Sequence, residues 1–359
     1  MRRCRTTIGL EYKGISRELT GRKPARNNGG LQEQAGAPLP KLTGTPGTVW
    51  LLAGPTATGK SAVAQWIAER CGAAILSADS MLVYRGMDIG TAKPSLAERG
   101  NVPYFGLDCV SPAEPFSVGD WLAHAQRGLA SLDASRPVIV AGGTGLYFRA
   151  LISGLDGAPA VPERRAYWKE FYTREGLEGL WRALETFGDA AALAPGDRNN
   201  PRRCIRALER AEQQAAKGDA APPAATWSAG GTPVVPVLCL PRDQLHARIE
   251  RRARRMFEDG LMDQAVALRA RGALSATARQ AIGYAEALAL ADGRMTEEAA
   301  LERVVIRTRQ LAKRQMTWFR HQFNVHWIEI TGDMPVPQVA GRVLEAWRQH
   351  GATPIQPFT

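Results

Sequence analysis

An eight-residue stretch combines glycines, a lysine and a serine in a spacing that suits phosphate binding. It reads Gly54-Pro55-Thr56-Ala57-Thr58-Gly59-Lys60-Ser61 and matches the pattern GxxxxGK[ST]. The glycines let backbone N–H groups wrap around an anion, and Lys60 adds a positive charge. The hydroxyl of Ser61 can hold Mg²⁺ beside the phosphates. This stretch therefore predicts a phosphate or diphosphate site with Mg²⁺ at Ser61.

Asp79 is the candidate carboxylate of this site. It comes after the apolar run Ala74-Ile75-Leu76, which is typical of a buried strand. Because the carboxyl ends of parallel strands meet at one edge of a sheet, Asp79 should lie beside the bound phosphates. It could act there as a general base, or it could merely cap the following turn. The other apolar run, residues 138–141, ends in a glycine-rich loop without the acid that an ordinary P-loop NTPase needs.

Alternating strands and helices position these residues. Strands are predicted at residues 48–53, 73–77, 137–141, 234–240 and 325–330. A helix through Val63 and Ile67 comes after the glycine-rich stretch, and a closing helix is predicted at residues 336–347. This order predicts an α/β fold: a P-loop NTPase-like parallel sheet flanked by helices, with an inserted, mainly helical subdomain.

Residues 1–47 differ in composition from the rest of the chain. They hold nine Lys or Arg and three Glu, are rich in Gly and Pro, and lack the apolar stretch of a secretory signal. We interpret them as a disordered basic leader, or as the product of a start codon placed too early. We expect the first part of the P-loop core at residues 48–160 and the helical insertion at residues 161–232. The second part of the core, with long basic helices, is expected at residues 233–350, and a tail at residues 351–359.

The net charge favours an anionic partner. Lys and Arg number 46 against 35 Asp and Glu, a formal charge of +11. Beyond the leader, basic residues gather at residues 198–210, 242–255 and 303–320. In the third stripe, apolar positions recur with a helical period, which leaves Arg303, Arg307, Gln310 and Arg314 on another face. Such a face suits a nucleic-acid phosphate backbone, although a basic helix face is often only solvated.

Composition excludes several classes of protein. The longest apolar runs, near residues 49–53 and 234–240, are far shorter than the roughly 20 residues that cross a bilayer. The five cysteines form no CxxC pair and the five histidines show no metal-binding spacing, so neither a zinc cluster nor a disulfide framework is expected. These features favour a reducing, cytoplasmic setting without a membrane partner.

Five stretches, in sequence order, resemble motifs of the tRNA dimethylallyltransferase family, also called tRNA isopentenyltransferases. They read GPTATGKS, SADSMLVYRGMDIGTAKPS, GGTGLYFRALISGL, RQAIGYAEAL and RTRQLAKRQMTWFR, and the likeness covers roughly residues 48–330. The resemblance implies a Mg²⁺-dependent transferase. It would move a dimethylallyl group from dimethylallyl diphosphate to N6 of adenosine 37 in tRNAs that read codons beginning with U. The expected partner is the tRNA anticodon stem-loop, and the expected state is a monomer.

The same resemblance assigns roles around the P-loop. The diphosphate would lie on residues 54–61, with Mg²⁺ at Ser61. Asp79 would accept the N6 proton, and Thr144 would lie beside the reacting centre, where its hydroxyl could bind a phosphate oxygen or the adenine edge. Arg248 would grip the diphosphate, because a guanidinium stabilises the negative charge that develops on this leaving group.

The resemblance also implies a set of tRNA contacts. They belong to the loop after the second strand, to the glycine-rich loop, to the helical insertion and to the third basic stripe. They are Asp79, Ser80, Met81, Leu82, Thr144, Arg165, Arg202, Arg203, Arg206, Gln280, Gly283, Tyr284, Lys313, Arg314, Gln315, Thr317, Trp318 and Arg320.

Three other functions share some of these features. A small-molecule or nucleotide kinase would use the same P-loop and sheet, but it gives no reason for the Arg-rich stripes. A relative that prenylates free adenine nucleotides would keep the chemistry, and the third stripe argues against it. A non-catalytic RNA-binding protein would leave Asp79 and the P-loop unexplained.

Overall fold

The computed structural model describes residues 42–155, 161–187, 193, 195–217 and 233–356. Most of the predicted leader, residues 218–232 of the predicted insertion and the end of the tail lie outside the described residues. None of the helices in the described part of the chain is both long and apolar enough to cross a membrane.

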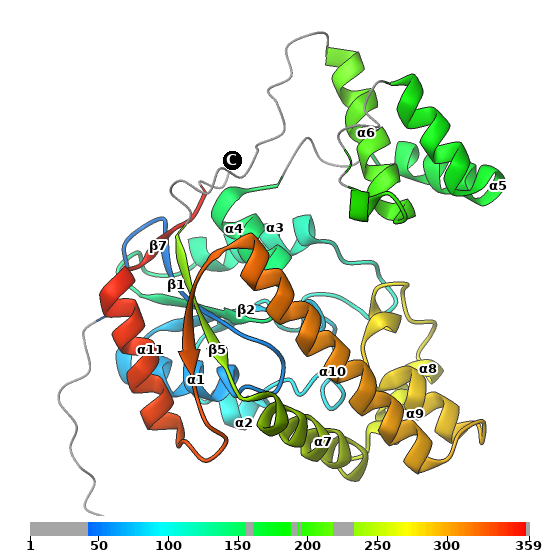
Figure 1. Cartoon of the computed structure of the whole chain (residues 1–359). Helices are drawn as coiled ribbons and strands as arrows, with labels where there is room; N and C mark the ends of the chain where they lie inside the picture. The colour runs from blue at the N-terminus through cyan, green and yellow to red at the C-terminus, as the bar shows by residue number, and fades with distance from the viewer. Residues whose placement is uncertain (1–41, 156–160, 188–192, 194, 218–232, 357–359) are drawn as a thin grey trace, which may run out of the picture. The chain divides into compact units, whose positions relative to one another are not determined.

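A largely parallel sheet forms the centre of the fold (Figure 1). Its strand order is β3-β2-β4-β1-β5-β6, and β7 pairs antiparallel with β1. The strands are β1 (Thr48–Ala53), β2 (Ala74–Ala78), β3 (Tyr104–Phe105), β4 (Val138–Gly142), β5 (Val234–Cys239), β6 (Asn324–Glu329) and β7 (Thr353–Pro354). The buried apolar residues of β1, β2 and β4 are typical of strands covered on both faces. The five predicted strands are confirmed, each shifted by at most one residue, whereas β3 and β7 are too short to leave a pattern.

Helices cover both faces of the sheet. They are α1 (Lys60–Cys71), α2 (Leu96–Arg99), α3 (Val118–Ala130), α4 (Gly145–Ser153), α5 (Pro162–Thr186), α6 (Pro201–Lys217), α7 (Arg242–Glu258), α8 (Leu261–Ala270), α9 (Tyr284–Ala291), α10 (Glu297–Gln322) and α11 (Val336–His350). α1 packs with α11, and α3 packs with α4 on the opposite face (Figure 1). The predicted α/β class with a parallel sheet flanked by helices is confirmed.

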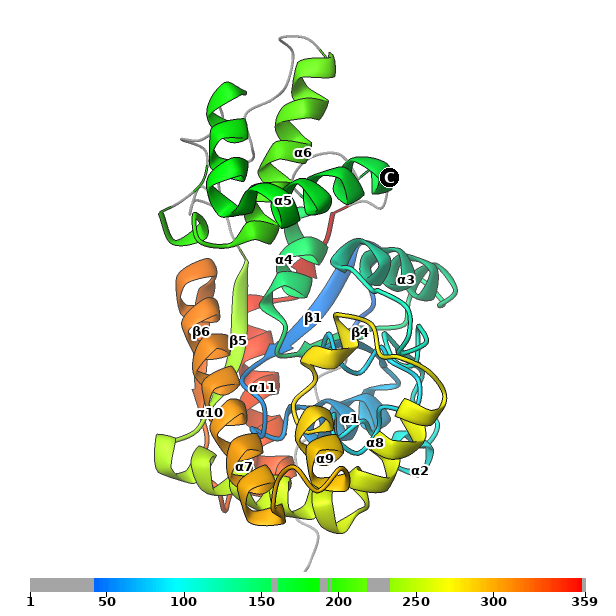
Figure 2. The same cartoon turned by 90° about the vertical axis from the view of Figure 1, so that its right-hand side faces the viewer.

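The segment predicted as an insertion forms a helical hairpin with its own apolar cluster (Figure 2). α5 and α6 pack against each other through Trp168, Leu180, Leu184 and Leu208, which are buried. Gly176 has a non-helical backbone (φ 66°, ψ −164°) and divides α5 into two helices. The helical character is therefore confirmed, while the boundaries that separate insertion and core stay a prediction.

Candidate active site

The P-loop joins β1 to α1 and folds into a tight cradle. Thr58 Oγ1 donates a hydrogen bond to the carbonyl oxygen of Pro55 at 2.9 Å, and Lys60 Nζ donates to the same oxygen at 2.7 Å. Gly54 has φ 153°, and a Cβ there would lie 2.9 Å from the carbonyl oxygen of Leu238. α1 begins at Lys60, so the N–H groups of its first turn lack helical acceptors and favour an anion.

A cavity of about 370 Å³ lies over this cradle at the carboxyl ends of β1, β2 and β4. The predicted site residues that line it come from four separate segments: Thr56, Ala57, Gly59, Lys60, Ser61, Asp79, Leu82, Arg248 and Gln315. Several further lining residues belong to none of the predicted site positions: Ile75, Thr91, Pro94, Tyr104, Leu107 and Arg252. The fold thus brings the phosphate loop, the candidate base and an apolar wall to one place.

Three charged groups of this cavity influence one another. Desolvation by burial lowers the pKa of Lys60 to about 8; Asp79 opposes this shift and Arg252 adds to it. Burial also lowers the pKa of Arg252, again against the attraction of Asp79. Two cations therefore face one carboxylate, and a bound diphosphate would supply the missing negative charge.

Asp79 lies in the loop after β2, where it both caps this loop and faces the cavity. Its Oδ1 accepts a hydrogen bond from the backbone N–H of Met81 at 2.9 Å, which is the contact expected of a capping residue. Its side chain also lines the cavity beside Lys60. One carboxylate can do both, since Asp carries two oxygens with several acceptor sites.

Thr144 comes directly after β4 and its loop, and its side chain holds the segment that carries Asp79. Its Oγ1 accepts the backbone N–H of Ser80 at 3.0 Å and lies 3.4 Å from Ser80 Oγ. Its own N–H donates to the carbonyl oxygen of Ala78 at 3.0 Å. Thr144 therefore links the ends of β2 and β4 beside Asp79, and it contributes no surface to the cavity in the described part of the chain.

α7 presents two arginines to the P-loop, one turn apart. Arg248, the predicted clamp, donates to the carbonyl oxygens of Thr58 at 3.3 Å and Gly332 at 2.8 Å. Arg252 donates to Thr56 Oγ1 at 3.1 Å and to the carbonyl oxygen of Thr91 at 3.0 Å. Arg252 interacts with Asp79 and Lys60, so it is the more central of the two. Its spacing of four residues from Arg248, on one helix face, was the signal that could have found it.

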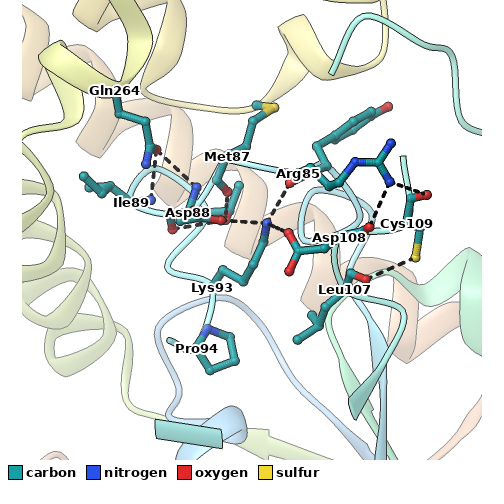
Figure 3. A network of polar contacts seen from close by, with 12 residues as sticks. Arg85, Met87, Asp88, Ile89, Lys93, Pro94, Leu107, Asp108, Cys109 and Gln264 are labelled. Carbon is teal, nitrogen blue, oxygen red and sulfur yellow. Dashed lines mark hydrogen bonds and ion pairs between the residues drawn. The ribbon is translucent and has the colours of Figure 1, made fainter. Parts of the chain in front are cut away.

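The wall of the cavity between Asp79 and Pro94 has little regular structure and is braced by a buried lysine (Figure 3). Lys93 Nζ donates to the carbonyl oxygen of Tyr84 and to Asp108 Oδ1, both at 2.6 Å, and lies 2.8 Å from Asp88 Oδ1. Only 2% of its side chain is exposed. This network fixes the segment that carries Thr91, the acceptor of Arg252.

Several arginines predicted as tRNA contacts are engaged inside the helical hairpin. Arg165 binds the buried carboxylate of Glu209 through two hydrogen bonds, at 2.7 and 2.9 Å, and Arg206 adds a third at 3.1 Å. Arg203 forms an ion pair with Asp197. Arg202 is exposed, and no ion pair of its side chain occurs among the described residues. Of these four arginines, Arg202 is therefore the one whose predicted tRNA contact competes with no ion pair among the described residues.

The predicted tRNA contacts near α9 make hydrogen bonds within the protein. Gly283 has φ 105°, and its N–H donates to Glu286 at 3.0 Å. Tyr284 is buried, and its hydroxyl donates to Gln264 at 2.8 Å. Gln280 is exposed and donates to the carbonyl oxygen of Ala276 at 3.3 Å.

The end of α10 carries the predicted contacts that face solvent. Lys313, Arg314, Thr317 and Arg320 are exposed, and Arg320 lies over the ring of Trp327 at 5.7 Å. Trp318 is half-buried and presses against the glycine-rich loop: a Cβ on Gly145 would lie 1.9 Å from its ring. The Lys313 and Arg314 side chains make no ion pair within the described residues. This exposed turn is a basic surface near the cavity, which Gln315 of the same turn lines.

Comparison with protein families identifies relatives over most of the chain. A family model described as IPP transferase matches residues 82–322, and one described as isopentenyl transferase matches residues 47–102. The tRNA dimethylallyltransferase of Myxococcus xanthus (strain DK1622) is 41% identical over 294 residues, which cover 80% of this chain and 92% of that protein. The tRNA dimethylallyltransferase of Thermomicrobium roseum is 38% identical and covers 83% of this chain and 91% of its own length.

Solved structures give the same result. The full-length tRNA isopentenylpyrophosphate transferase from Bacillus halodurans matches with a TM-score of 0.55 at 34% identity, covering 84% of this chain and 99% of that one. A eukaryotic dimethylallyltransferase solved acting on tRNA shares the fold, with a TM-score of 0.62 at 20% identity, over 84% of this chain and 76% of its own. The chain therefore belongs to the tRNA dimethylallyltransferase family.

Proposed function

We propose that this protein transfers a dimethylallyl group from dimethylallyl diphosphate to N6 of adenosine 37 in tRNA. The products are N6-(dimethylallyl)adenosine and diphosphate. The observation that carries this proposal is the cavity over the P-loop, where a phosphate cradle, the Asp79 carboxylate and apolar side chains meet. The cradle would bind the diphosphate, the Asp79 carboxylate would serve the attacking amine, and the apolar side chains would hold the short prenyl tail.

In this reaction N6 attacks the allylic C1 atom. A nitrogen–carbon bond forms while the C1–O bond breaks, and its electron pair leaves with the diphosphate. The N6 proton passes to Asp79, which lines the cavity and keeps acceptor capacity beside its contact with Met81. Thr144 supports this step indirectly, because its hydroxyl fixes the loop through Ser80.

The leaving group is the part of the substrate that gains negative charge. The cradle of residues 54–61 offers N–H groups and Lys60, and Arg248 and Arg252 lie at its other side. Preorganised cations and N–H donors stabilise such charge most effectively where water is excluded. We therefore assign Arg252 to the diphosphate together with Arg248.

Mg²⁺ fits this site as a companion of the substrate. Ser61 contributes an exposed hydroxyl at the cavity, and no cluster of three His, Cys, Asp or Glu side chains exists among the described residues. A Mg²⁺ ion prefers oxygen ligands and retains several waters, so Ser61 and the diphosphate would hold it. Bound there, it would neutralise charge on the departing diphosphate.

The tRNA is expected to approach the open side of the cavity. Exposed Lys313, Arg314, Thr317 and Arg320 suit its backbone, and Ser80, Met81 and Leu82 lie beside Asp79. Adenosine 37 must leave the anticodon-loop stack to reach the carboxylate. Preference for tRNAs that read codons beginning with U, a monomeric state and a cytoplasmic location complete the proposal.

One assay tests this function against its alternatives. The purified protein is incubated with Mg²⁺, labelled dimethylallyl diphosphate, and either unmodified tRNA or AMP. Label in tRNA at adenosine 37 is expected. Label in AMP alone would indicate a nucleotide prenyltransferase, and consumption of ATP without prenyl transfer would indicate a kinase.

A further inference from the structure

Gln315 connects α10 to the P-loop. Its Oε1 accepts the backbone N–H of Thr56 at 2.9 Å, a contact between residues far apart in the chain. The side chain is half-buried and lines the diphosphate cavity. The family resemblance implied that Gln315 contacts tRNA, but the hydrogen-bond partner of its side chain belongs to the phosphate cradle.

The glycine-rich loop after β4 leaves room for this side chain. A Cβ on Gly143 would lie 2.4 Å from Gln315 Nε2 and 3.2 Å from the carbonyl oxygen of Gly54. The amide of Gln315 therefore fills a crevice between the two glycine-rich loops. Packing on both sides restricts its rotamer and directs Oε1 at Thr56.

Thr56 is held from its other end by α7. Its Oγ1 accepts from Arg252, which also donates to Thr91. A chain of contacts thus runs from Gln315 through Thr56 to Arg252. Each member lines the cavity, so a shift of Gln315 would displace both the cradle and its central arginine.

The neighbours of Gln315 on α10 differ from it in direction. Lys313, Arg314 and Thr317 are exposed, whereas Gln315 reaches the P-loop. One helical turn therefore presents cations to solvent and a single amide to the cradle. The two functions expected of this turn, RNA binding and diphosphate binding, are divided between its residues.

We propose that Gln315 is a positioning residue of the diphosphate cradle, acting through the Thr56 amide and Arg252, and that it does not read the RNA. The inference rests on the proposed function, because it assumes that the cradle binds dimethylallyl diphosphate. It predicts that loss of the Gln315 amide weakens the binding of dimethylallyl diphosphate much more than the binding of RNA.

The test measures the two binding steps separately. Gln315→Met keeps the size of the side chain and removes the acceptor. We expect the Kd for dimethylallyl diphosphate with Mg²⁺, measured by calorimetry without tRNA, to rise about 5- to 30-fold, the effect of losing one buried hydrogen bond. The Kd for unmodified anticodon stem-loop RNA should change less than about twofold. The opposite pattern would overturn the proposal.

Two further variants keep the outcome interpretable. Gln315→Asn keeps the amide but is one methylene too short to reach Thr56, so it should weaken diphosphate binding like Gln315→Met. Arg314→Gln, on the same turn, should weaken RNA binding and leave the diphosphate Kd unchanged. If the wild-type protein binds both ligands yet transfers nothing, the proposed function fails; if it transfers normally and both Gln315 variants bind diphosphate normally, only the role of Gln315 fails.

Discussion

The cradle and the Glu286 cluster each bring two cations to one carboxylate, but they differ in which of the charges is withdrawn from water. At Glu286 a carboxylate that is 2% exposed is bound by Arg307 and by the N–H of Gly283, and Arg303 lies 3.7 Å away. In the cradle, Lys60 and Arg252 face Asp79 with lowered pKa values. A buried acid bound by partly exposed arginines stabilises the fold, whereas cations that are themselves desolvated indicate a place for an anionic ligand.

The largest effect is expected from Asp79→Asn, which separates capping from proton transfer. The amide oxygen can still accept the N–H of Met81, so the loop should keep its shape. Turnover should fall about 10²–10⁴-fold, because a general base is lost. Single-turnover prenyl transfer measures this, with tRNA Kd and melting temperature as controls. Near-normal turnover would mean that Asp79 only caps its loop.

Glu286→Ala should affect stability and not chemistry. Removing the acid leaves Arg307 and the Gly283 N–H without their partner, so the free energy of unfolding should fall by about 2–4 kcal/mol. Urea unfolding measures this change. Glu250→Ala, which breaks exposed pairs with Arg254 and Arg309, is the matched control and should leave the midpoint almost unchanged. A stable Glu286→Ala protein with poor turnover would contradict the comparison.

The lowered pKa of Lys60 predicts a pH dependence of diphosphate binding. Below pH 8 the ammonium is charged and attracts the ligand; above it the charge is lost, so affinity should fall about tenfold by pH 9. Calorimetry of the tRNA-free protein with dimethylallyl diphosphate, which does not titrate between pH 8 and 9, measures this. Lys60→Arg stays charged over this range, so its profile should be flat even if binding is weaker. A flat wild-type profile would place the pKa of Lys60 well above 8.

The smallest effect distinguishes two arginines of one helix. Arg314→Gln should weaken tRNA binding a few-fold and lower the salt slope by about 1, as expected for one lost phosphate contact. Arg303→Gln should leave the slope unchanged, because this arginine lies against Glu286. Equal effects of both substitutions, measured by tRNA binding at several salt concentrations, would remove the distinction between the two halves of α10.

Local patterns predicted the strands and the P-loop because apolar runs and glycine spacing are contained in short windows. Arg252 lies one turn from Arg248 and was accessible to the same helical reasoning. Ion pairs between distant segments were not accessible: Arg165 binds Glu209 across the hairpin, and Arg307 of the third basic stripe binds Glu286 on another helix. Charge counting along the chain cannot detect an acid that folding brings from elsewhere, so it overstated the basic surface available to tRNA.

The close approach of Gly145 to Trp318 constrains how this sequence can evolve. With 1.9 Å between a Cβ and the indole ring, any side chain at position 145 must be accompanied by a smaller residue at position 318 or by a shift of α10. A single substitution of Gly145 by a larger residue is therefore expected to destabilise the fold, while a smaller residue at position 318 could relieve the clash. Changes at positions 145 and 318 should consequently occur together among descendants of this chain.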